Sequence, residues 1–256
     1  MKTIFFILAI TSSVIAQRPS AQKNRDVLFD FRKEPPASAV KIPAATQRTV
    51  LTKVFRRYLT NQDKCKSDFA GSNSDDYLAA ARKAGMMVPS ITDMITGSFT
   101  AAGQTQTAYL ISVSECNASH ADNFGTTRLA IFSGPQLVAD VDTDFMSFIV
   151  RKIDVDGNGI DELLMNSSYM GQGNLTEMAT LASFENGRRH VLNDFGSVVE
   201  DSCAAAMPGS NSKAAVIYTS AFAPGLKPTF TQENYVASCR NPRRWKLFSK
   251  GKMQEQ

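Results

Sequence analysis

The chain has 256 residues, with 28 Lys and Arg against 24 Asp and Glu, and a formal net charge of +4 at pH 7. This length suffices for one large domain or two small ones, each with a buried core. So modest a charge excludes the concentrated basic face of a nucleic-acid-binding protein.

Residues 1–16 have the layout of a secretory signal peptide. Lys2 gives a positive start, an apolar run extends from Ile4 to Ile15, and Ala16 precedes the cleavage point. The run is about a dozen residues, shorter than the roughly 20 that a membrane-spanning helix needs, so a membrane anchor is the weaker interpretation. We expect an exported protein, secreted or periplasmic, with no transmembrane segment after cleavage.

The rest of the chain divides by composition. The predicted segments are an extended or disordered lead-in (17–45), a helical cap (46–95), a β-rich domain (96–250) and a short tail (251–256).

The helical cap is expected to contain two helices. In the first, Val50, Leu51 and Val54 share one face at helical spacing, and arginines lie elsewhere. The second begins with Ser74 as its N-cap and ends at Gly85. We interpret the arginines as a solvated helix face; an anionic-ligand site is the alternative.

From Ser98 onward, segments rich in β-branched and aromatic residues alternate with turn residues, which predicts a mainly β fold of antiparallel sheets. The expected strands are Ala108–Val113, Arg128–Phe132, Phe145–Ile153, Glu162–Met165, Thr180–Phe184, Ala214–Thr219 and Arg244–Phe248. Two loops, Ser98–Gln104 and Asp154–Ile160, align position for position, and each precedes a strand. The loops begin at residues 98 and 154, and a repeat at that spacing suggests repeated sheet units, such as part of a propeller.

Four cysteines form an even set in a chain expected to be exported, which predicts disulfide bonds. Three connectivities are possible. We favour Cys65–Cys116 with Cys203–Cys239, because neighbours in sequence usually pair in compact domains. No CxxC element occurs, which argues against a zinc knuckle or a redox motif.

The sharpest local chemistry is an acidic, glycine-punctuated loop at residues 154–162. Calcium takes six to eight oxygen ligands from a tight loop, and Gly159 permits the left-handed turn that such a loop needs. The predicted ligands, with Ile160 offering its backbone carbonyl, are Asp154, Asp156, Asn158, Ile160 and Glu162. Asp161 contributes through water or lies outside the shell.

This loop resembles the short calcium loops of FG-GAP and VCBS-type repeats, found in integrin-like propellers and in many exported bacterial proteins. The resemblance covers mainly residues 154–162, where Glu162 replaces the usual aspartate. It implies a calcium ion held between two strands. The earlier loop has Ala102 and Gln106 where acids would be needed, so we expect it to be metal-free.

Two alternatives compete with this interpretation. An EF-hand needs an acid at the twelfth loop position, where this chain has Met165. An EF-hand loop also lies between two helices, whereas the segments that flank this loop are predicted to be strands. We therefore reject the EF-hand. The second alternative is an acidic β-turn held only by Asx hydrogen bonds.

No HExxH, GxSxG or GxxxxGK[ST] motif occurs, and the chain has only two histidines. The densest polar segment contains His120, Glu115 and Asp122, which are candidates for acid and base catalysis. The simpler interpretation is a disulfide-pinned loop whose polar groups bond to its own backbone.

The leading hypothesis is an exported, disulfide-stabilised, calcium-binding β-rich protein that is not an enzyme. Its role would be to bind a protein or polysaccharide partner outside the cytosol, or to serve as a scaffold there. The alternative is an exported hydrolase with a site around His120.

Overall fold

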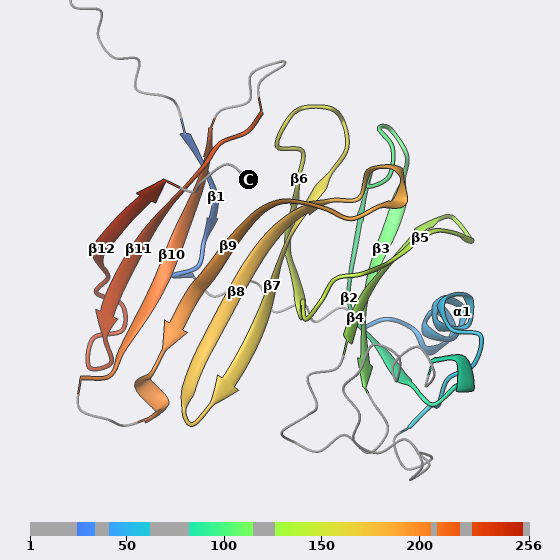
Figure 1. Cartoon of the computed structure of the whole chain (residues 1–256), viewed down its shortest axis with the longest axis horizontal. Helices are drawn as coiled ribbons and strands as arrows, with labels where there is room; N and C mark the ends of the chain where they lie inside the picture. Colours follow the sequence, from blue (N-terminus) through green and yellow to red (C-terminus); the bar gives the residue numbers. More distant parts are fainter. Residues whose placement is uncertain are drawn as a thin grey trace, which may run out of the picture.

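The computed structural model describes residues 25–33, 41–61, 82–114, 126–205, 209–220 and 227–252. This part of the chain is mainly β, with twelve strands in two antiparallel sheets (Figure 1). The strands are β1 Arg25–Asp30, β2 Val88–Gly97, β3 Gln106–Ser114, β4 Thr126–Ser133, β5 Gln136–Asp142, β6 Phe148–Ile153, β7 Glu162–Gly171, β8 Asn174–Ser183, β9 His190–Asp201, β10 Asn211–Ser220, β11 Phe230–Ser238 and β12 Lys246–Lys252. The helix α1 spans Ala44–Val54, and the short 3-10 helices η3 and η4 span Glu185–Gly187 and Cys203–Ala205.

The strands group into three units of four. Strands β2 to β5 make a separate sheet, the first unit, and β6 to β9 form the second unit within the larger sheet. The third unit consists of β10, β11 and β12 together with β1. Strand β10 pairs with β9 only over Ser212–Ala214 and then with β1 over Val216–Ser220. The N-terminal strand therefore completes the C-terminal unit.

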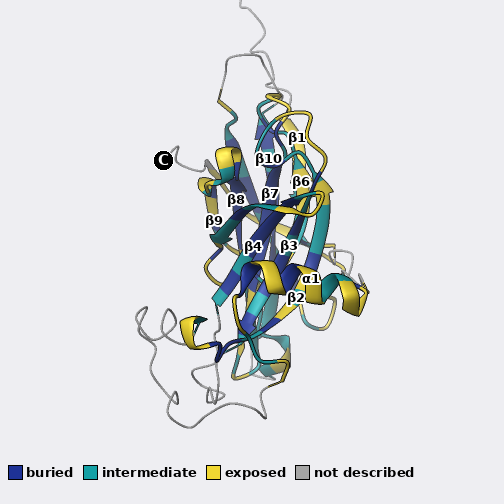
Figure 2. Cartoon of the chain, turned by 90° about the vertical axis from the view of Figure 1, so that its right-hand side faces the viewer, coloured by how far each residue is buried: buried dark blue, intermediate teal, exposed yellow. Residues whose placement is uncertain are grey.

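The units lie face to face, with α1 on the outer face of the first (Figures 1 and 2). Leu163 of β7 belongs to the core shared with the first unit, whereas its neighbour Leu164 belongs to the core shared with the third. Successive side chains of a strand point to opposite faces, so a strand between two cores needs apolar residues on both. This accounts for the continuous buried run at the start of β7.

The first strands of the three units are neighbours. The buried Asp93 carboxylate on β2 accepts a hydrogen bond from the Ile149 backbone N–H of β6 at 3.0 Å. The Arg151 side chain of β6 in turn donates to the Leu28 carbonyl of β1 at 3.0 Å. Side-chain bonds therefore join strands that come from distant parts of the chain.

The mainly β prediction is confirmed, and each of the seven predicted strands overlaps an observed one. The helix with Val50, Leu51 and Val54 on its buried face is also confirmed, as α1. Of the second predicted helix, residues 82–84 are helical and Gly85 follows with a φ of +75°; its start lies outside the described residues.

Two predicted boundaries are wrong. Residues 88–95, placed in the helical cap, belong to strand β2, because pairing with β3 along its length outweighs its mixed polar sequence. Arg25–Asp30, placed in the lead-in, is strand β1, because Leu28 and Phe31 are buried in the core of the third unit.

The Cys203–Cys239 disulfide is present, as predicted, and joins the segment after β9 to the end of β11. Cys65 and Cys116 lie outside the described residues. Where the structure describes helices, none is long and apolar enough to cross a membrane.

Candidate metal centre

The acidic loop joins β6 to β7 in the second unit. Its apolar residues Val155 and Ile160 are buried, and Val155 belongs to the core between the second and third units. Gly157 and Gly159 have φ values of +70° and +81°, a left-handed conformation that glycine adopts without strain. The loop can therefore curl back so that its two ends meet.

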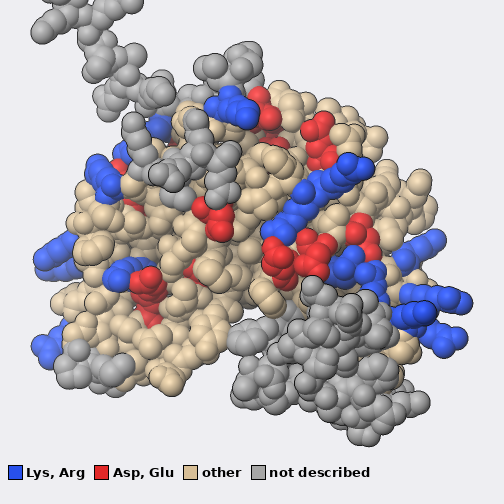
Figure 3. Space-filling model, viewed as in Figure 1, with Lys and Arg blue, Asp and Glu red and all other residues tan. Residues whose placement is uncertain are grey.

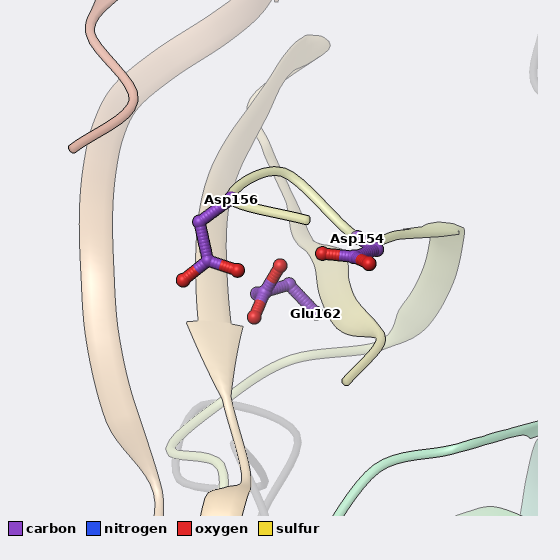
Figure 4. A group of neighbouring side chains, drawn as sticks. All are labelled: Asp154, Asp156 and Glu162. Carbon is purple, nitrogen blue, oxygen red and sulfur yellow. The ribbon is translucent and has the colours of Figure 1, made fainter. Parts of the chain in front are cut away.

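Three carboxylates converge inside this curl. One oxygen from each of Asp154, Asp156 and Glu162 lies within 4.8 Å of the others (Figure 4). Glu162 is 1% exposed, whereas both aspartates are at least partly exposed. The cluster thus combines one buried carboxylate with two that are partly exposed.

Hydrogen bonds from the backbone shape the loop around these acids. The Asp154 carboxylate accepts from the N–H groups of Gly157 at 2.6 Å, Asn158 at 3.1 Å and Gly159 at 2.9 Å. Asp156 accepts from the Asn158 N–H at 3.1 Å. These are Asx-type bonds, so the loop has the hydrogen bonds expected of an acidic turn. A carboxylate offers about four lone-pair sites, so each acid retains capacity for a cation.

The buried Glu162 is electrostatically unusual. The pKa of its carboxyl is raised to about 7, first by burial and then by the nearby Asp156 and Asp154, although a hydrogen bond from the Val155 N–H at 2.9 Å lowers it. Within the described residues, none of the three acids forms an ion pair with Lys, Arg or His. A buried carboxylate beside two others needs a proton or a cation.

In the equivalent loop of the first unit, residues 98–105, the buried polar side chain is an uncharged amide. Its Gly103 has a φ of +72°, matching Gly159, and the buried Gln106 stands where Glu162 does. The Gln106 amide oxygen accepts from the N–H groups of Phe99 and Thr100. Its amide nitrogen donates to the side chains of Thr100 and Gln104 at 2.6 and 3.0 Å. The Gln106 amide is thus satisfied by hydrogen bonds within its own loop.

The two loops are in direct contact. The Asp161 N–H donates to the Ser98 carbonyl at 2.6 Å, and the Ser98 N–H donates to the Asp161 carboxylate at 2.8 Å. A Cβ atom on Gly97 would lie 2.5 Å from that carboxylate, so the approach requires glycine. Asp161 also pairs with Lys152 at 3.4 Å. It therefore bridges two loops and stands outside the carboxylate cluster.

Not all of the predicted side-chain ligands belong to the carboxylate cluster. Asp154, Asp156 and Glu162 come together, whereas the Asn158 side-chain oxygen accepts from the Ile160 N–H at 2.7 Å. The candidate catalytic residues of the alternative hypothesis, His120, Glu115 and Asp122, lie outside the described residues.

Sequence reasoning missed the part that Asp161 plays between the loops. The aligned pair of loops could have indicated this contact, because repeated hairpins in adjacent units place their connecting loops side by side. Sequence reasoning also missed Asp93, because residue 93 was placed in the helical cap; its carboxylate is buried in β2 and accepts a hydrogen bond from β6. No family model, curated protein or solved structure matches this chain.

Proposed function

We propose that this protein is an exported calcium-binding β-rich protein in which the ion stabilises the fold. The observation that carries the proposal is the buried Glu162 carboxylate, placed beside Asp154 and Asp156 with no described cation near it. A divalent cation supplies the missing positive charge and uses the free lone pairs of all three acids.

The chemistry of the donors favours calcium over other metals. The cluster offers only carboxylate oxygens, and neither cysteine nor histidine is part of it. Zinc and copper sites usually include sulfur or imidazole ligands. Magnesium retains its water and seldom takes an all-protein cage, whereas calcium accepts irregular oxygen shells completed by carbonyls such as that of Ile160.

Calcium would act where the first and second units meet. The acidic loop is hydrogen-bonded through Asp161 to Ser98 of the neighbouring loop. An ion that orders residues 154–162 therefore also orders the contact between the two units. This arrangement and the repeated loops support the likeness to FG-GAP and VCBS-type repeats.

The biological role that follows is binding or scaffolding outside the cytosol, in a secreted or periplasmic location. The Cys203–Cys239 disulfide and the signal-peptide-like N-terminus support this placement. Extracellular calcium is abundant, so a Kd on the order of 10⁻⁴–10⁻³ M would keep the site filled. The partner we expect is a protein or a polysaccharide.

Thermal unfolding with calcium and with excess EGTA tests the proposal. Binding to the folded state alone stabilises by roughly 2.7 kcal/mol at a hundredfold excess over Kd. We expect a calcium-dependent rise in Tm for the wild type that Asp156→Ala abolishes. Asp26→Ala, which removes an exposed carboxylate from β1, is the control and should keep the rise. Equal Tm values with and without calcium in the wild type would refute the proposal.

A further inference from the structure

A pocket separate from the acidic loop lies on the first unit, between the C-terminal end of α1 and strands β3, β4 and β5. Its volume is about 660 Å³, within the range typical of small-molecule sites. Its described walls are formed by Val54, Phe55, Arg56, Arg82, Lys83, Met87, Val113, Thr126, Arg128 and Asp142. Figure 3 shows Lys and Arg side chains gathered along the edge of the molecule where α1 lies.

A fixed ion-pair network forms one side of this pocket. The Asp140 carboxylate accepts from Arg82 at 2.7 Å and from Arg128 at 2.7 Å, so one acid holds two guanidinium groups. Arg82 also donates to the Val54 carbonyl at the end of α1 and lies over the Phe55 ring. Arg128 and Asp140 have side chains less than one-fifth exposed. The network is therefore pre-organised before any ligand arrives.

The network leaves positive charge and hydrogen-bond donors unused. Arg82 makes its bonds through Nη2, and Arg128 makes its bonds through Nε and Nη2, so the Nη1 group of each has no described acceptor. A guanidinium carries five N–H donors in a fixed fork. Exposed Arg56 and Lys83 add two cations that form no ion pair within the described residues.

Among the described lining residues, acids do not balance this charge. Besides Asp140, which is already shared between two arginines, the described lining contains Asp142. One Asp142 oxygen accepts from the Asp144 N–H at 2.7 Å. Four described cations therefore stand against Asp142 of the lining and the Asp140 carboxylate behind it, which gives the described part of the pocket a net positive charge.

The remaining described lining is mainly apolar and adjoins the cationic side, since Arg82 lies over the Phe55 ring. Phe55 and Met87 are buried, and Val113 of β3 completes a hydrophobic surface next to the cationic one. We propose that this pocket binds a small organic anion, with a carboxylate or phosphate group facing Arg56, Lys83 and Arg128 and an apolar body against Phe55. Arginine favours such acceptors because its N–H groups match their paired oxygens.

The test uses 8-anilinonaphthalene-1-sulfonate, an aromatic anion whose fluorescence rises in apolar surroundings, with the folded wild type. We expect saturable binding that is weakened about tenfold in the double variant Arg56→Ala with Lys83→Ala, since two cations facing the anion are lost. Lys227→Ala, a charge removal at an exposed site on the third unit, is the matched control and should leave the affinity unchanged. Both substituted positions are exposed, so the variants should fold; circular dichroism verifies this.

Two further measurements test whether the anionic group is what the pocket recognises. The neutral analogue N-phenyl-1-naphthylamine should bind the wild type and the double variant equally, because it lacks the anionic group. Octanoate and octyl phosphate should displace the probe, and the stronger competitor identifies the head group. Equal probe affinity in wild type and double variant, or displacement by neither competitor, would overturn the proposal. Because the acidic loop is not part of this pocket, the result is independent of whether the protein binds calcium.

Discussion

Gln106 and Glu162 occupy equivalent positions in the two aligned loops, and both side chains are 1% exposed. Each accepts a hydrogen bond from the residue after the start of its loop, Gln106 from Phe99 and Glu162 from Val155. They differ in charge: the Gln106 amide donates to its own loop, whereas Glu162 meets two further carboxylates. This difference separates a loop whose buried polar group is satisfied within the loop from one whose buried carboxylate needs a proton or a cation.

Replacing Glu162 with Gln should make the acidic loop resemble the neutral one. In EGTA at pH 7.5 we expect Glu162→Gln to be more stable than the wild type, by roughly 1–3 kcal/mol, because a buried charge is removed. Calcium should stabilise the variant little. Chemical denaturation with and without calcium measures both effects, and a variant less stable than the wild type in EGTA would contradict this account.

The converse substitution, Gln106→Glu, should be destabilising whether or not calcium is present. It places a carboxylate in a buried position and removes the amide N–H bonds to Thr100 and Gln104. The cost should be about 2–4 kcal/mol. Calcium should not restore the loss, because the loop offers Ser98 and Thr100 where the acidic loop has aspartates. Restoration by calcium in a denaturation experiment would mean that these loops bind metal by a different set of ligands.

Without metal, the unfolding free energy of the wild type should depend on pH through Glu162. The folded pKa, about 7, lies above the ordinary value of 4.5, so the folded state holds a proton that the unfolded state releases. The stabilisation from this group is therefore complete below 4.5 and is lost as pH rises to about 7. Denaturation in EGTA between pH 4.5 and 7.5 should show this loss in the wild type and not in Glu162→Gln.

Glu233 on the outer face of the third unit should behave in the opposite way. Burial by itself raises its pKa, but hydrogen bonds from Tyr235, Arg25 and Lys250 outweigh burial and lower the pKa to about 2. Its stabilisation is therefore complete above pH 4.5 and is lost as pH falls towards 2. Glu233→Gln should cost about 1–3 kcal/mol at pH 7. Acid titration should then show the two proteins converging near pH 2, and a constant difference at all pH values would count against this assignment.

Asp93 should be needed for the contact between the first and second units. Its carboxylate accepts from the N–H groups of Met94 and Ile149, so Asp93→Ala leaves buried donors without their acceptor. We expect a cost of about 2 kcal/mol. Ser90→Ala, at an exposed position on the same strand, is the matched control and should cost little. Hydrogen exchange at Ile149 should quicken in Asp93→Ala only.

Much of the fold was predictable because local patterns express it directly. The apolar face of α1 and the β-branched strands such as β4 are readable from periodicity. Strand β9 was missed because Gly196, with a φ of +60°, and several register shifts interrupt its alternation. Strand β11 was missed because its buried Gln232 and Glu233 look like surface residues until their partners are known, Asn234 on the same strand and Tyr218 on β10.

In the candidate site, too, local features were predictable and features that depend on packing were not. The convergence of Asp154, Asp156 and Glu162 was predictable since all three lie within one short loop. The burial of Glu162 and the contact between Asp161 and Ser98 were not, because they depend on how two units pack together. An anionic-ligand site was the alternative interpretation of the arginines near α1, but the pocket beside Arg128 was not predictable, since its walls come from distant segments.

Calorimetric titration of the folded protein with calcium tests the central claim most directly. The account predicts one calcium ion per chain in the wild type, with a Kd on the order of 10⁻⁴–10⁻³ M. Binding should be lost in Asp156→Asn, which keeps the shape of the side chain, and retained in Asp161→Asn, whose carboxylate lies outside the cluster. No heat of binding in the wild type at millimolar calcium, or full binding in Asp156→Asn, would contradict it.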